Sequence, residues 1–322
     1  MVGRKFRRSE SFPAPKPSGG RTAAAKSSFR ARCISLPSRT HPLAAHLADD
    51  LHHLLSWTSS SSPSPDARCI SDGLARLHLL LAGLPDVLQL PHAQDPLRRS
   101  RHRSPALADR LLDDFLRLAD AHGSFRSALL ALKQHLAAAQ VALRRRDEPR
   151  LASCLRAQRR AGKDLTELSS AVRETRRRAQ PAGFAAGTAA TTEEAEVARV
   201  MWEVAVSVAE ASETVFLGVA EISAAATASA ADATSSRFPW AAAVLRWRAR
   251  ATSKSLKKKA SPENGGEMLS EEKEVEKWRK AALEKLGAAE DAIGSLEIGG
   301  ELVFRSLVNV RVTLLNLLTP AF

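Results

Sequence analysis

Apolar side chains recur every three or four residues along most of this chain, the spacing of α-helices that each bury one face. The first predicted helix begins at Pro42, because proline suits a first helical turn, and runs to Trp57 before the serine run at 59–64. The second begins behind Asp66, a residue type that caps helix N-termini, and is expected to close at Gly83.

The pattern of predicted helices continues through the middle of the chain. A polar stretch at 91–103 is followed by Ser104-Pro105, which predicts a helix start, and this helix is expected to stop at Gly123 and restart at Ser124. Residues 147–178 predict a further helix that is strongly basic.

Two stretches rich in small and polar residues predict linkers near 179–190 and 260–268. Between them, Thr191 and Glu194 form a capping box in front of a long helix with a valine-rich face. A basic segment at 240–259 leads into the second linker.

The last fifty residues carry apolar positions from Val275 to Leu317 in steps of three and four, as in helices that pack side by side. From Leu302 to Leu318 the apolar stripe widens beyond a two-helix seam, which predicts several neighbours for this helix. The fold class is therefore all-α: a multi-helix bundle over 41–322 with a long central C-terminal helix.

Composition and charge extend this picture. The chain has 322 residues, of which 44% are hydrophobic and 5% aromatic, and three cysteines that favour a reducing compartment. Its net charge is +13, and residues 1–40 contain ten basic groups against Glu10 alone. We expect 1–40 to be a disordered basic tail, able to contact an anionic membrane or an acidic partner, or to serve as a transit peptide.

No apolar core follows the first basic residues, and the most apolar stretch contains arginine and asparagine, so neither a secretory signal nor a transmembrane helix is expected. The predicted location is intracellular, first the cytoplasm, with the chloroplast or the membrane periphery as alternatives. No helix-turn-helix or zinc module accompanies the basic charge, which argues against nucleic acid as a partner.

The sequence contains no recognisable catalytic, metal-binding or cofactor-binding motif. All nine histidines precede residue 136, but none has cysteine or carboxylate partners at ligand spacing. No nucleophile elbow or phosphate-binding loop is present either. We therefore expect no cofactor and no enzyme.

Arg311 is the residue that stands out in the last helix. Its neighbours at helical spacing are apolar, which predicts a buried guanidinium that needs a carboxylate partner. Asp114, Glu203 and Glu210 are the candidates for an internal ion pair that fixes the register of the helices.

Two serines in the tail are candidate phosphorylation sites. Arg32 precedes Ser35 by three residues and Pro37 follows it by two, a frame that suits a basophilic kinase and a 14-3-3-type protein. Ser9 follows an arginine pair in a similar kinase-type frame. A solvated tail without a fixed partner is the alternative for both.

A basic run lies beside Trp240 and Trp247 and leads into the second linker. It is a candidate patch for an anionic membrane or for nuclear import, with a solvated flank as the alternative. The run consists of Arg246, Arg248, Arg250, Lys254, Lys257, Lys258 and Lys259.

Two stretches of the sequence resemble a known family. The first is Ser35-Leu36-Pro37-Ser38-Arg39-Thr40-His41-Pro42 with the helix behind it, and the second is the ending from Phe304 to Thr319, FRSLVNVRVTLLNLLT. Both resemble the plant-specific BYPASS-type family, whose biochemical function is unknown.

The resemblance implies a helical plant protein tied to root and shoot development and to a root-derived mobile signal. We expect a non-enzymatic scaffold or regulator that acts through protein partners or a membrane surface. An enzyme of a small signalling metabolite and a peripheral membrane protein are the alternatives.

Overall fold

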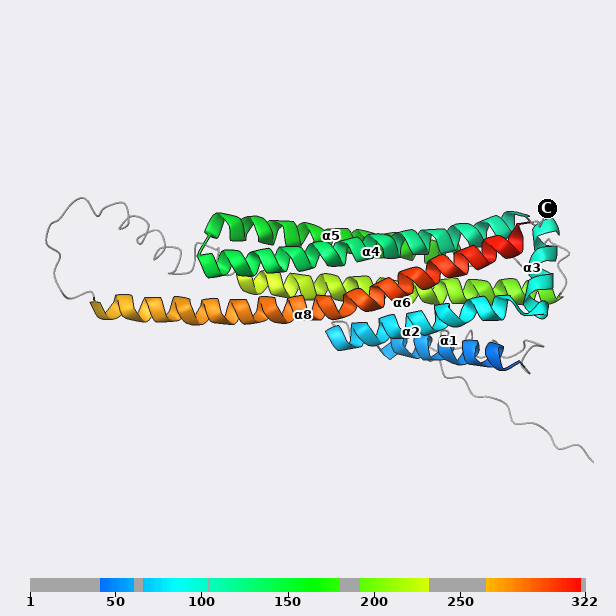
Figure 1. Ribbon diagram of the computed structural model, residues 1–322, viewed down its shortest axis with the longest axis horizontal. Helices are drawn as coiled ribbons and strands as arrows, with labels where there is room; N and C mark the ends of the chain where they lie inside the picture. Colours follow the sequence, from blue (N-terminus) through cyan, green and yellow to red (C-terminus); the bar gives the residue numbers. More distant parts are fainter. Residues whose placement is uncertain (1–40, 61–65, 104, 180–191, 232–264, 320–322) are drawn as a thin grey trace, which may run out of the picture. The chain divides into compact units, whose positions relative to one another are not determined.

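The computed structural model describes residues 41–60, 66–103, 105–179, 192–231 and 265–319, all within one compact unit, Ser38–Phe322. Every element in these residues is an α-helix, which confirms the predicted all-α class (Figure 1). The helices are α1 Pro42–Ser60, α2 Ala67–Leu88, α3 Pro91–Arg103, α4 Pro105–Arg145, α5 Glu148–Ala179, α6 Thr192–Ala231 and α8 Gly265–Leu318.

The polar stretch at 91–103, for which no helix was predicted, is helix α3. It buries Ala93, Leu97 and Ser100, which share one face, so a narrow apolar stripe suffices in an otherwise charged segment. Arg99 then reaches the first turn of α6, where its guanidinium lies 3.0 Å from the Glu193 carboxylate.

Two expected helix ends are also wrong. Helix α2 continues through Gly83 and Pro85 to Leu88, because its buried leucine face outweighs one lost backbone hydrogen bond. Helix α4 continues through Gly123, where the missing side chain makes room for Phe304 of α8. A Cβ atom at Gly123 would lie 3.3 Å from the Phe304 ring.

Helix α8 begins at Gly265, so the end of the linker predicted at 260–268 is helical. From Ala282 to Leu317, the predicted apolar seam is buried, as the prediction requires.

The buried apolar side chains form one cluster to which every described helix contributes. Its largest fully buried members include Phe115 and Phe125 of α4 and Phe216 of α6. The rings of Phe125 and Phe216 stack with centroids 4.6 Å apart, which joins α4 to α6.

Polar contacts along the edge of the core fix the antiparallel register of α4 and α8. Lys133 Nζ lies 2.8 Å from a Glu297 carboxylate oxygen, and Arg126 pairs with Glu301 further along the same edge. The charge and hydrogen bond of Glu297 raise the pKa of Lys133.

Helix α5 has fewer neighbours than the other long helices. It packs against α4 and α6 and, among the described helices, contacts no other, so it lies at an edge of the bundle (Figure 1). One side of α5 is therefore left to solvent along the whole helix.

Candidate functional site

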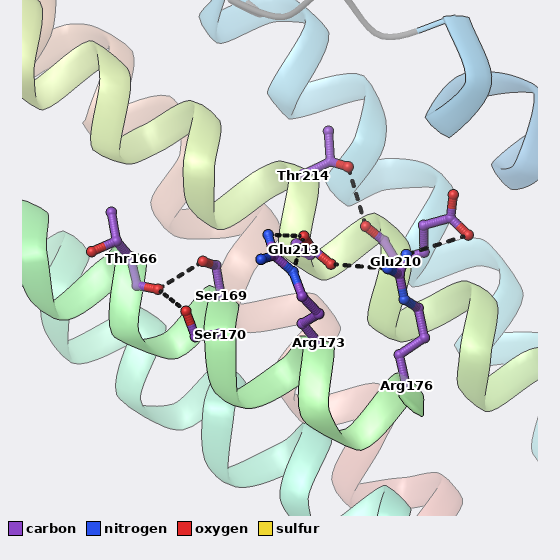
Figure 2. Close-up of polar contacts among 8 residues, drawn as sticks. All are labelled: Thr166, Ser169, Ser170, Arg173, Arg176, Glu210, Glu213 and Thr214. Atoms are coloured by element: carbon purple, nitrogen blue, oxygen red, sulfur yellow. Dashed lines mark hydrogen bonds and ion pairs between the residues drawn. The ribbon is translucent and has the colours of Figure 1, made fainter. Parts of the chain in front are cut away.

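The second half of α5 meets an acidic turn of α6, defined here as residues 210–214. Arg173 Nε donates a hydrogen bond of 2.7 Å to Glu213 Oε1, and the guanidinium of Arg176 lies 3.9 Å from Glu210 and 3.8 Å from Glu213 (Figure 2). The Glu213 side chain is only 13% exposed. Its hydrogen bond and charge raise the pKa of Arg173, so these charges stabilise each other between the two helices.

The helix turns around this contact satisfy their own polar groups. The hydroxyls of Ser169 and Ser170 both donate to the carbonyl of Thr166, and Thr214 donates to the carbonyl of Glu210 (Figure 2). These serines and threonines are therefore bonded within their own helices, and the polar contacts that join α5 to α6 here are the ion pairs.

The same turn of α6 also contacts a buried histidine of α4. His122 is fully buried, and its Nε2 lies 2.8 Å from Ser212 Oγ. Because the Ser212 hydroxyl donates to the carbonyl of Val208 at 2.7 Å, it accepts from His122, which assigns the proton to Nε2. Burial lowers the pKa of His122 to about 3, so the ring is neutral at physiological pH.

The first half of α5 has a different character. Four basic side chains on its outer side are exposed, and among the described residues no ion pair includes any of them. We call this set the basic face; it consists of Arg156, Arg159, Arg160 and Lys163. The sequence predicts a basic helix here, and this face was not among the predicted sites, although the spacing of the four residues indicates it.

Arg311 does not form the predicted internal ion pair. It is half-buried, and the described residues contain no ion pair between it and Asp114, Glu203 or Glu210. The reason is that the apolar face is less enclosed than its width predicts, since Val308 and Val312 are 40% and 46% exposed. Solvent therefore reaches part of the guanidinium, although Arg311 Nε is buried without a hydrogen-bond partner.

The three candidate acids lie elsewhere in the bundle. Glu210 approaches Arg176 instead, and Glu203 lies on α6 in a half-buried position. Asp114 is 2% exposed on α4, and burial raises the pKa of its carboxyl while the nearby Arg110 charge opposes this.

The remaining predicted sites, Ser9, Ser35 and the basic run 246–259, lie outside the described residues. Within the described residues, no group of three histidine, cysteine or acidic side chains could hold a metal ion. None of the described helices combines the length and the apolar character needed to cross a bilayer.

The bundle, with its helix–helix ion pairs and basic edge, defines an all-α protein of several long helices. A family model, Protein BPS1, matches residues 73–317, and the chain therefore belongs to the BPS1 family. This confirms the resemblance to the BYPASS-type family. Comparison with curated proteins and with solved structures finds no match.

Proposed function

We propose that this chain is a non-catalytic scaffold or regulator of plant root and shoot development, acting through contacts with proteins or with a membrane surface. The observation that carries the proposal is where the perturbed titratable groups lie. His122, whose pKa is lowered to about 3, is fully buried between α4 and α6 and cannot touch a substrate. Asp114 is likewise enclosed by the bundle.

The ion pairs support the same proposal. Glu213 binds Arg173 across α5 and α6, and Glu297 binds Lys133 across α4 and α8. An enzyme would instead gather such groups around a concave site open to its substrate. Here the charges hold helices in register, as a scaffold requires.

The test expresses the full-length protein in plant tissue from which the natural protein has been removed. The variant His122→Leu removes the ring that an acid–base enzyme would need but keeps an apolar side chain in the core. We expect this variant to restore root and shoot development and to recover the same protein partners on affinity purification as the natural chain. Failure to restore development by a variant that shows native helicity and still recovers the same partners would favour the enzyme alternative.

A 14-3-3-type protein remains a proposed partner through Ser35. Its arginine cluster would bind the phosphate of a modified Ser35 in the frame set by Arg32 and Pro37. Affinity purification of the natural chain and of Ser35→Ala tests this, since recovery of a 14-3-3-type protein should require Ser35. Equal recovery from both would contradict the proposed contact.

A peripheral membrane protein is the second candidate, and the basic face of α5 favours it. The proposed location is the cytoplasm, with the membrane periphery as the place of action.

A further inference from the structure

The basic face of α5 is compact and points away from the bundle. Successive residues of a helix are turned by about 100°, so Arg156, Arg159, Arg160 and Lys163 fall within about 100° of arc. All four side chains are exposed, while Leu155, Ala161 and Leu165 on the opposite side are buried in the core.

The neighbouring helices offer these charges no counter-ions. Gln158 Nε2 donates to the Ser223 carbonyl, which places the first half of α5 beside a part of α6 that has no charged residue from 222 to 231. The C-terminal part of α4, from 121 to 145, contains no acid either. Glu221 of α6 is exposed and belongs to none of the ion pairs among the described residues.

The spacing of the basic face brings like charges close together. Arg156 precedes Arg159 by three residues and Arg160 by four, and Lys163 follows them at the same separations. Like charges at these separations repel each other on a helix. Asp164 and Glu167 follow Arg160 and Lys163 by four residues on α5, and neither acid belongs to an ion pair among the described residues. A face whose charges form no ion pair in the described part of the chain is available to a partner outside the chain.

We propose that the basic face of α5 binds the surface of an anionic phospholipid membrane. This inference rests on the proposed function and names the surface through which a membrane would be contacted. The guanidinium groups match phosphate geometry, and long side chains on a convex helix reach a fluid, flat surface without needing a groove. Helix α5 contains no aromatic residue, whereas single-stranded nucleic acid requires aromatic stacking.

The rest of the sequence supports a membrane as the occupant. Residues 1–40 contain ten basic groups, and a second basic run near Trp247 combines charge with an aromatic side chain, as interfacial segments do. Several weak electrostatic contacts on one chain add up on an extended anionic surface.

The experiment is cosedimentation of the full-length protein with phosphatidylcholine vesicles, with and without phosphatidylserine. We expect binding only when phosphatidylserine is present and loss of this binding at high salt. The test variant replaces the basic face by four substitutions: Arg156→Gln, Arg159→Gln, Arg160→Gln and Lys163→Gln. We expect its partition to anionic vesicles to fall by more than about tenfold.

A matched control removes the same number of positive charges elsewhere. Its four exposed residues lie on α2, α3 and α8, and the substitutions are Arg68→Gln, Arg98→Gln, Lys277→Gln and Lys280→Gln. Both variants have the same net charge, so we expect the control to lose less than about threefold, because only local charge contacts the lipid. Circular dichroism should give the same helicity for both variants.

Three results would overturn the inference. The natural chain fails to bind phosphatidylserine vesicles, or the control variant loses as much binding as the test variant, or the basic face is needed for binding an RNA duplex while vesicles are ignored. None of these results affects the restoration of development by His122→Leu, so failure of this inference is distinguishable from failure of the proposed function.

Discussion

The two halves of α5 contain similar numbers of basic side chains but meet different surroundings. In the second half, Arg173 and Arg176 face the acidic turn of α6 and pair with Glu213. In the first half, the basic face lies beside the neutral stretch 222–231 of α6, and its charges remain in solvent.

The difference teaches that the side of the helix on which an arginine lies, not the residue type, decides what it does. Facing α6 and an acid that is mostly enclosed, an arginine stabilises the helix packing. On the outer side of the same helix, an arginine contributes nothing to the core and is left for an external partner. The predictions below test each side of this contrast.

The largest expected effect on stability concerns His122, the buried residue of α4 that is hydrogen-bonded to Ser212 in the acidic turn of α6. Its folded pKa of about 3 lies below the ordinary value of 6.5, so from pH 6.5 towards 3 only the unfolded chain binds the proton. Stability from this group is complete above pH 6.5 and falls with pH in this window, by about 1.4 kcal/mol per unit. Urea unfolding at several pH values measures this dependence.

The matched protein is His122→Leu, whose stability should depend less steeply on pH between 6.5 and 4. Asp114 has a raised pKa and acts in the opposite direction, but it is present in both proteins and cancels in the comparison. Equal slopes for the two proteins would show that His122 is not enclosed as described.

The next largest effect on stability is expected in the second half of α5, where Arg173 and Arg176 pair with Glu213. The substitution Glu213→Ala removes the acid that Arg173 and Arg176 share, and we expect it to lower the free energy of unfolding by about 1–2 kcal/mol. The control Glu174→Ala removes an acid that is 50% exposed and pairs with Arg178 within α5. Urea unfolding should give a much smaller loss for the control, and equal losses would remove the contrast between enclosed and surface pairs.

The smallest effect on stability is expected in the first half of α5, where the basic face forms no ion pair among the described residues. The substitution Arg160→Gln removes two like-charge neighbours on α5, Arg156 and Lys163, and one opposite charge, Asp164. Because two repulsions outweigh one attraction, we expect a net rise of about 0.2–0.5 kcal/mol in the free energy of unfolding at low salt. The gain should disappear at high salt, because the repulsion is screened. Chemical denaturation at two salt concentrations measures it.

Arg117→Gln serves as the opposite case, since Arg117 pairs with Asp113 at 2.9 Å on α4. Its removal should lower the free energy of unfolding slightly. A loss of stability in Arg160→Gln would show that the basic face has a structural partner.

Much of the fold could be predicted from the sequence, because the long helices have regular apolar faces. The seam of α8 from Ala282 to Leu317 and the start of α1 at Pro42 are examples. Helix α3 could not be predicted, since its buried face consists only of Ala93, Pro96, Leu97 and Ser100 within a charged segment. Its helical state depends on tertiary contacts such as that of Arg99 with α6.

The candidate site was less predictable for a similar reason. The spacing of Arg156 to Lys163 indicates one helix face, but their lack of partners depends on which parts of α4 and α6 lie beside them. Arg311 shows the opposite error: apolar neighbours at helical spacing predicted full burial, yet part of that face remains open to solvent. Periodicity shows which side chains share a face but not what covers it.

The most direct test of the account asks which side of the bundle touches lipid. A fluorophore is placed at Ser153→Cys, an exposed position beside the basic face, or at Ser295→Cys on α8, which among the described helices does not contact α5. The natural cysteines, Cys33, Cys69 and Cys154, are first replaced by alanine. With anionic vesicles that contain a lipid-borne quencher, the account predicts strong quenching at position 153 and little at 295, whereas equal quenching, or quenching only at 295, would contradict it.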